Sequence, residues 1–143
     1  MFALGVLAIL AAIALPNWGT LLPSYYLNSA TRQVQSELHN SKSRATAQNI
    51  SYRLNFSTNQ SYKIEKDPGS GWQDSGENKP LPEGIKITGD SDTALGFTSR
   101  GTATPGVGGT IKLCNNRSEG KNVVVSSTGR IRTENATCTY PST

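Results

Sequence analysis

The sequence predicts an α+β fold in which a long N-terminal helix packs on a small antiparallel β-sheet domain. Three observations support this class. An apolar run at residues 2–15 continues into a helix-compatible stretch that reaches about residue 48. Short segments of alternating apolar and polar residues follow, as is typical of strands with one buried face. Charged residues make up only 17% of the chain, while Gly, Ser, Thr and Asn are plentiful, which favours a β-rich extracytoplasmic domain.

The apolar run, FALGVLAILAAIAL, contains no charged or polar side chain. As a helix it would be about 21 Å long, which is shorter than the roughly 30 Å hydrocarbon core of a bilayer. Three interpretations are open: a signal peptide cleaved near residues 12–14, a helix buried in a soluble core, and the distal part of a membrane helix. A signal peptide requires basic residues before its apolar run, and no Lys or Arg is present there. A helix buried in a soluble core is also disfavoured, because no face of the run is polar. We therefore favour the membrane helix.

Residues 17–48 show a helical pattern, because apolar or small residues recur at three- and four-residue steps. This stripe comprises Leu27, Ala30, Val34, Leu38, Ser41, Ala45 and Gln48. Pro16 and Pro23 are expected to kink the helix, since proline removes a backbone donor and clashes with the preceding turn. We therefore divide the chain into an apolar helix segment at residues 1–23, its amphipathic continuation at 24–48, and a β-rich domain at 49–143.

Asn49 is expected to end the helix, and the rest of the chain is expected to form short strands. These strands are predicted at residues 50–56, 61–66, 84–88, 94–98, 110–114, 121–126 and 130–133. Residues 67–82, rich in Gly, Pro, Ser and Asn, are expected to form a long mobile loop that Trp72 attaches to the body. Residues 102–109 are expected to be a flexible connector, and no Lys-Ser/Thr pair follows their glycines as a phosphate-binding loop would require.

Cys114 and Cys138 are the only two cysteines. An even count in a chain of this composition favours a disulfide in an oxidising compartment. Closing a loop of about 25 residues would stabilise the fold by roughly 3 kcal/mol. A zinc site needs more ligands than two cysteines and one distant histidine supply, so we expect no metal.

The formal charge of +4 comes entirely from the last third of the chain, because residues 1–95 contain equal numbers of basic and acidic side chains. Residues 96–143 contain the basic residues Arg100, Lys112, Arg117, Lys121, Arg130 and Arg132 against Glu119 and Glu134. This asymmetry indicates a polyanionic partner, with ordinary solubility as the alternative. The only histidine, His39, falls on the predicted solvent face of the helix, so we expect neither an enzyme nor a cofactor.

Two patches of the sequence match one family of proteins. Residues 6–16 (VLAILAAIALP) are similar to the end of the N-terminal helix of type IV pilins. Residues 96–101 (GFTSRG), 109–114 (GTIKLC) and 123–132 (VVVSSTGRIR) follow one another in the order of the GspH/FimT family of minor pseudopilins, which this chain resembles. The resemblance implies a single-pass helix in the bacterial inner membrane, packed with other pilin or pseudopilin subunits, and a domain facing the periplasm. Members of the family begin with a basic leader that the sequence lacks before Met1. Two explanations are open: the true start lies upstream of Met1, or this copy is not processed in the usual way.

The segment Gly129-Arg130-Ile131-Arg132 is the most specific local signal. Glycine permits a turn, and in an extended strand the two arginines project from the same face about 6.6 Å apart. That spacing suits two neighbouring phosphates, which guanidinium groups bind bidentately.

Resemblance to the competence-linked FimT branch implies that this Gly-Arg-x-Arg segment binds double-stranded DNA, without sequence preference, during natural transformation. Lys112, Arg117 and Lys121 are expected to extend the basic patch. Two alternatives remain open. Arg130 can instead pair with Glu134 or Glu119, and the chain can be a structural minor pseudopilin of a type II protein secretion system with no role in DNA binding.

Overall fold

The computed structural model describes residues 18–89 and 91–141, so the apolar run and Pro16 lie outside the described residues. Within these ranges, one helix, α2 (Trp18–Gln48), is followed by ten strands. The strands are β1 (Ser51–Asn55), β2 (Ser61–Asp67), β3 (Gln73–Asp74), β4 (Lys79–Pro80), β5 (Ile85–Ile87), β6 (Ala94–Phe97), β7 (Ala103–Thr104), β8 (Gly108–Asn115), β9 (Glu119–Ser126) and β10 (Ile131–Thr137). No helix within the described ranges combines the length and the hydropathy needed to cross a bilayer.

The helix α2 buries the predicted stripe along most of its length. The buried members are Leu27, Ala30, Val34, Leu38, Ser41 and Ala45. Thr31 is buried beside them, and its hydroxyl donates to the carbonyl of Leu27 at 2.7 Å. Gln48 was expected to complete the stripe but is exposed, because it is the last residue of the helix.

The two ends of α2 differ in how the backbone is arranged. Near its start, the helix runs unbroken through Pro23. At its end, Asn49 adopts a left-handed φ of 56°, and the N–H of Ile50 donates to the carbonyl of Ala45 at 3.2 Å. A left-handed residue followed by such a bond is the Schellman termination of a helix. The predicted helix end at Asn49 is therefore confirmed.

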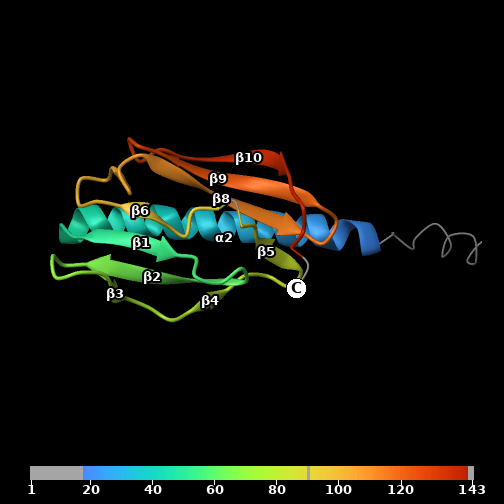
Figure 1. Ribbon diagram of the computed structural model, residues 1–143, viewed down its shortest axis with the longest axis horizontal. Helices are drawn as coiled ribbons and strands as arrows, with labels where there is room; N and C mark the ends of the chain where they lie inside the picture. Colours follow the sequence, from blue (N-terminus) through green and yellow to red (C-terminus); the bar gives the residue numbers. More distant parts are fainter. Residues whose placement is uncertain (1–17, 90, 142–143) are drawn as a thin grey trace, which may run out of the picture.

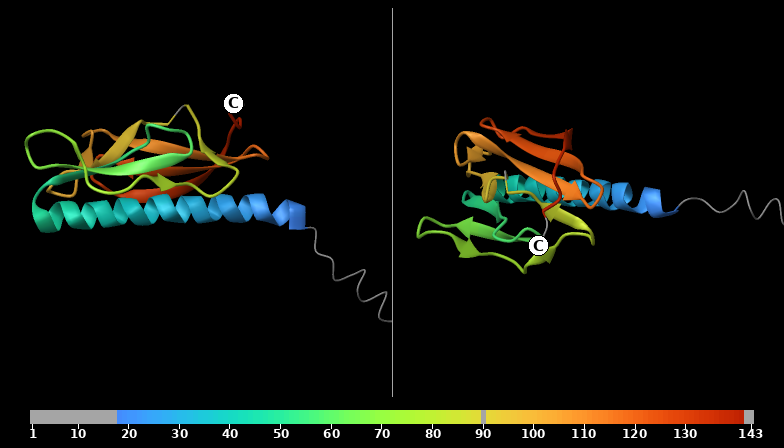
Figure 2. Two further views of the ribbon diagram at one scale, coloured as in Figure 1. Left: turned by 90° about the horizontal axis from the view of Figure 1, so that it is seen from below. Right: turned by 45° about the vertical axis from the view of Figure 1, so that its right-hand side comes forward.

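Two antiparallel sheets lie side by side on one side of α2 (Figures 1 and 2). The first has the order β3-β2-β1-β6-β7, and β4 also pairs with β2, at the start of β2, whereas β3 pairs near its end. The second has the order β10-β9-β8-β5. Fully buried side chains from both sheets, including Leu54, Phe97, Leu113 and Val123, pack with the buried stripe of α2 in one core. The predicted α+β class is confirmed.

Two segments expected to be loops contain short strands instead. Within residues 67–82, β3 and β4 both pair with β2, and β7 within residues 102–109 pairs with β6. Trp72 attaches the first segment to the body, as expected, because the guanidinium of Arg53 stacks over its ring, 4.0 Å from the centroid. Arg53 is held there by Glu65, whose carboxylate accepts a bond from the arginine Nε at 2.6 Å.

The predicted disulfide is confirmed. Cys114, near the end of β8, is bonded to Cys138, which follows β10, and their Cα atoms are 6.0 Å apart. After Cys138 the chain crosses toward β5. There the buried Lys86 donates to the carbonyl of Pro141 at 3.0 Å, and its ammonium lies 4.8 Å from the centroid of the Tyr140 ring.

Candidate functional site

The hairpin between β9 and β10 carries the two arginines that the sequence singled out. Its turn closes with two backbone bonds: the N–H of Gly129 donates to Ser126 at 2.8 Å, and the N–H of Ser126 donates to the carbonyl of Arg130 at 2.9 Å. Gly129 has a φ of 80°, a conformation that side-chain-bearing residues rarely adopt. The turn that the sequence permits at Gly129, between the strands predicted at 121–126 and 130–133, is therefore present, and the backbone requires its glycine.

Gly129 has a second role, because it is packed against Gly101. A Cβ atom at position 129 would overlap the carbonyl oxygen of Gly101, which also has a positive φ, 78°. Lys42 of α2 closes this contact: its Nζ donates to the carbonyl of Gly129 at 2.9 Å and lies 5.7 Å from the centroid of the Phe97 ring. Two segments of the second patch, residues 96–101 and 123–132, thus meet in space through a contact that neither segment predicts alone.

Arg130 and Arg132 are both exposed. Arg132 lies in β10, and Arg130 just precedes it, with its carbonyl paired to Ser126 in the same register. Strand alternation therefore places both side chains on the face that points away from α2. The Nε of Arg132 donates to Glu134 at 2.7 Å, and both side chains are about half exposed. Glu134, one of the two alternative partners of Arg130, instead pairs with Arg132, which lies two residues away on the same face. Within the described ranges the guanidinium of Arg130 makes no hydrogen bond or ion pair.

The other predicted basic residues do not form one patch with this pair. Lys112 of β8 is opposite Asn122 of β9, which is opposite Glu134 of β10. Lys112 therefore lies on the same outer face as the arginines, but two strands away from β10. Lys121 is opposite Asn135 and faces the side of the sheet that covers α2. Arg117 lies in the turn between β8 and β9, at the other end of the sheet. The expectation that Lys121 and Arg117 extend the arginine pair is wrong, because strand register separates them from it.

At that other end, Glu119 joins the β8–β9 turn to the start of α2. Its carboxylate oxygen accepts bonds from the hydroxyl of Ser24 at 2.7 Å and from the side-chain amide of Asn115 at 2.8 Å. These two bonds, that of Ser24 first, lower the pKa of Glu119 below its ordinary value of 4.5. Glu119 is therefore ionised near neutral pH and is committed to a structural contact.

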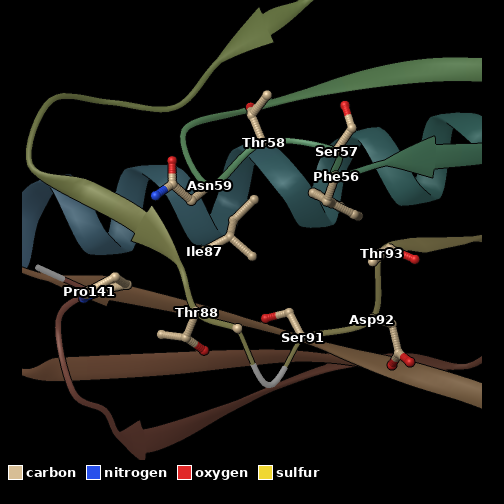
Figure 3. Close-up of a pocket in the computed structure, with 11 residues that line it drawn as sticks. Phe56, Ser57, Thr58, Asn59, Ile87, Thr88, Ser91, Asp92, Thr93 and Pro141 are labelled. Carbon is tan, nitrogen blue, oxygen red and sulfur yellow. The ribbon is translucent and has the colours of Figure 1, made fainter. Parts of the chain in front are cut away.

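A cavity of about 340 Å³ lies between the loop after β1 and the loop after β5 (Figure 3). Phe56 and Ile87 form its apolar wall, and hydroxyl groups such as those of Ser57 and Ser91 surround it. The hydroxyl of Thr88 is buried without a hydrogen-bond partner. No three His, Cys, Asp or Glu side chains of residues 18–89 and 91–141 are grouped closely enough to hold a metal ion.

Comparison with known proteins agrees with this architecture. The family model described as type II transport protein GspH matches residues 30–129. The fold is similar to that of the type IV minor pilin FimU of Pseudomonas aeruginosa, with a TM-score of 0.65 at 19% identity, covering 80% of this chain and 95% of that one.

A second similar structure is the minor pseudopilin EpsH of the Vibrio cholerae type 2 secretion system, with a TM-score of 0.61 at 15% identity, covering 76% of this chain and 96% of that one. No curated protein sequence matches the chain. Because the family model spans most of the chain and the fold agrees with both solved structures, this protein belongs to the GspH family of pilin-like proteins.

Proposed function

We propose that this chain is a minor subunit of a type IV pilus or of the related type II secretion pseudopilus. In this assignment the apolar run and the start of α2 anchor the subunit in the inner membrane and pack against other subunits. The disulfide-bonded domain then faces the oxidising periplasm. The family assignment and the likeness to a minor pilin and a minor pseudopilin support this proposal.

The observation that carries the proposal is the apolar surface at the start of α2. Four large side chains there are exposed: Leu21 (65%), Leu22 (41%), Tyr25 (67%) and Tyr26 (37%). From Leu27 onward the same helix buries its large apolar side chains, Leu27, Val34 and Leu38, under the sheets. In sequence, this exposed surface lies just beyond the apolar run of residues 2–15, and residues 16–20 separate the two. A contiguous apolar surface on a soluble protein marks a contact with a partner or a membrane.

The test is assembly of the full chain in a bacterium that builds such filaments. We expect the chain in the membrane fraction and in sheared filaments. Replacing Leu21 and Leu22 by glutamate should remove it from the filaments, while the matched change of Ser43 and Thr46, exposed at the other end of α2, should not. A full chain that stays soluble without detergent and never sediments with membranes would refute the proposal.

DNA contact is a second candidate function, and one observation favours it. Arg130 and Arg132 are exposed on one face, and among the described residues no acidic side chain pairs with the guanidinium of Arg130. The Glu134 bond opposes this function, because Arg132 must exchange a carboxylate for a phosphate. A contact of two arginines with phosphates would be independent of sequence and strongly dependent on salt.

A gel shift of duplex DNA at low salt, with the full chain in detergent, tests this second function. The Arg130→Ala/Arg132→Ala variant should lose most of the binding. The control, Arg32→Ala/Arg44→Ala, removes the same charge from exposed positions of α2 and should retain it. If both variants bind alike, net charge alone explains the binding. In that case the chain is better described as a structural subunit, and neighbouring genes for secretion or for competence would identify its machine.

A further inference from the structure

The outer edge of β10 is a long unprotected edge. The other strands at sheet margins are short: β3, β4 and β7 have two residues each, and β5 has three. The edge of β5 is also partly covered, since the N–H of Ile87 donates to the carbonyl of Asn59 at 2.7 Å. β10 has seven residues and forms the margin of the second sheet, with no other element beyond it in Figure 1.

The register of the β9–β10 pair shows which backbone groups are free. The hairpin bond from Ser126 to Arg130 means that Arg132 and Glu134 use their N–H and C=O groups to pair with β9. The backbone N–H and C=O groups of Thr133 and Asn135 therefore point away from β9, toward the free edge of the sheet. No backbone bond beyond those to β9 involves residues 131–137 in the part of the chain that the structure describes.

Natural proteins usually protect such an edge with proline, a bulge or inward-pointing charges. β10 contains no proline, and the register with β9 is continuous from Ile131 to Thr137. Its two charged side chains, Arg132 and Glu134, lie on the face of the sheet away from α2 and pair with each other. These features leave the edge open to the addition of another strand.

A groove lies alongside this edge. A cavity of about 350 Å³ is bounded by Ser24, Leu27 and Asn28 of α2 and by Lys121, Asn135 and Ala136 of the sheet. Side chains alternate along an added strand, so residues opposite Asn135 would face this groove, and residues opposite Arg132 and Glu134 would face the other side.

We propose that the edge of β10 binds an extended segment of another protein chain, which adds as an antiparallel strand. Antiparallel pairing matches every existing pair in both sheets and is the more stable arrangement. The segment carries a basic residue opposite Glu134, an acidic residue opposite Arg132 and a small residue opposite Asn135. This site differs from the apolar surface of α2 and does not depend on DNA contact.

The probe is a synthetic seven-residue peptide of threonines, with lysine, glutamate and alanine at these three positions and blocked ends. It is added to the full chain in detergent, and amide hydrogen exchange is followed. We expect exchange at Thr133 and Asn135 to slow at least about fivefold. A peptide in which the lysine and the glutamate swap positions should bind about fivefold more weakly, because its charges would then be opposite like charges of β10.

Two N-methylated peptides are the matched controls. Methyl groups on the residues opposite Thr133 and Asn135 remove the donors that would pair with β10, and binding should be lost. Methyl groups on the residues opposite Arg132 and Glu134 occupy N–H groups that point away, and binding should persist. If neither unmodified nor modified peptides protect the edge, or if both methylated peptides bind alike, the proposal is wrong.

A variant of the protein gives a second test. Thr133→Pro removes an outward N–H that β9 does not use, and proline is tolerated at a strand edge facing solvent. It should abolish peptide binding, whereas Thr133→Val should retain it. If Thr133→Pro does not fold, as judged by circular dichroism, the pair of methylated peptides on the unaltered chain decides the question. Failure here with normal filament assembly would leave the subunit proposal intact.

Discussion

The two ends of the domain are stabilised in different ways. At the near end, where α2 begins, the Cys114–Cys138 disulfide and the Ser24–Glu119 bond join the sheet to itself and to the helix. At the far end, where α2 terminates, the contact of Gly101 with Gly129 and the bond from Lys42 do the same without a covalent link. The near end also exposes large apolar side chains from α2. The near end therefore has a covalent link where large apolar side chains are exposed, whereas the far end depends on close backbone packing.

The largest effect is expected from Gly129→Ala at the far end. The new Cβ would overlap the carbonyl of Gly101, and the positive φ would be strained. Together these costs should lower the free energy of unfolding by about 4 kcal/mol. Chemical denaturation measures the loss. Gly106→Ala is the control, because a Cβ there meets no atom within 4 Å; if it destabilises equally, the packing explanation is wrong.

The next effect is expected from the near end. Replacing Cys114 and Cys138 by alanine should lower the free energy of unfolding by roughly 3 kcal/mol, because the unfolded chain regains the entropy of an open loop. Denaturation of the oxidised protein, the reduced protein and the double variant measures this effect. Reduction should match the double variant, and a reduced protein as stable as the oxidised one would mean that the disulfide does not hold the near end together.

Lys42→Met tests the bond between the helix and the hairpin. The methionine keeps the packing against Phe97 but leaves the carbonyl of Gly129 without its charged donor. We expect a loss of about 2 kcal/mol, within the range for a hydrogen bond to a charged group. Thermal unfolding is the measurement, and His39→Met, at an exposed position of the same helix, should change little. Equal losses in the two variants would assign the effect to helix composition.

The smallest effect, and the only one that depends on pH, is expected for Ser24→Ala. The pKa of Glu119 is lowered in the folded protein, so its contribution is present above the ordinary pKa of 4.5 and is lost as the pH falls through the folded value. The melting temperatures of the two proteins should therefore differ at pH 7 and converge as the pH falls through the lowered pKa of Glu119. Ser29→Ala, at an exposed position, should show no such convergence; a constant difference for Ser24→Ala would exclude Glu119 as its cause.

The sequence predicted those parts of the fold that repeat with a regular period. The stripe of α2 and the alternating strand β1 show this, since burial recurs along each of them. The two-residue strands β3, β4 and β7 were missed, because two residues have no period and form only through pairing with β2 or β6. β10 was predicted too short, because at a sheet margin its polar residues remain exposed and the alternation is lost.

The candidate site was predicted only in part, for a similar reason. The exposure of Arg130 and Arg132 follows from the local turn and strand. The placement of Lys121 on the opposite face depends on the register of β9, which no local pattern specifies. The contact of Gly129 with Gly101 joins two segments distant in sequence, and Lys42 enters from a third, so a single sequence gives no signal for it.

The C-terminal segment that crosses β5 has a practical consequence. Lys86 is only 5% exposed, and its ammonium is held by the carbonyl of Pro141 and the ring of Tyr140. Trimming the chain after Cys138, by design or by a carboxypeptidase, would leave a nearly buried cation without these contacts, which is costly. Purification tags placed at this terminus should therefore follow Thr143 through a spacer, so that cleavage during handling spares the last residues.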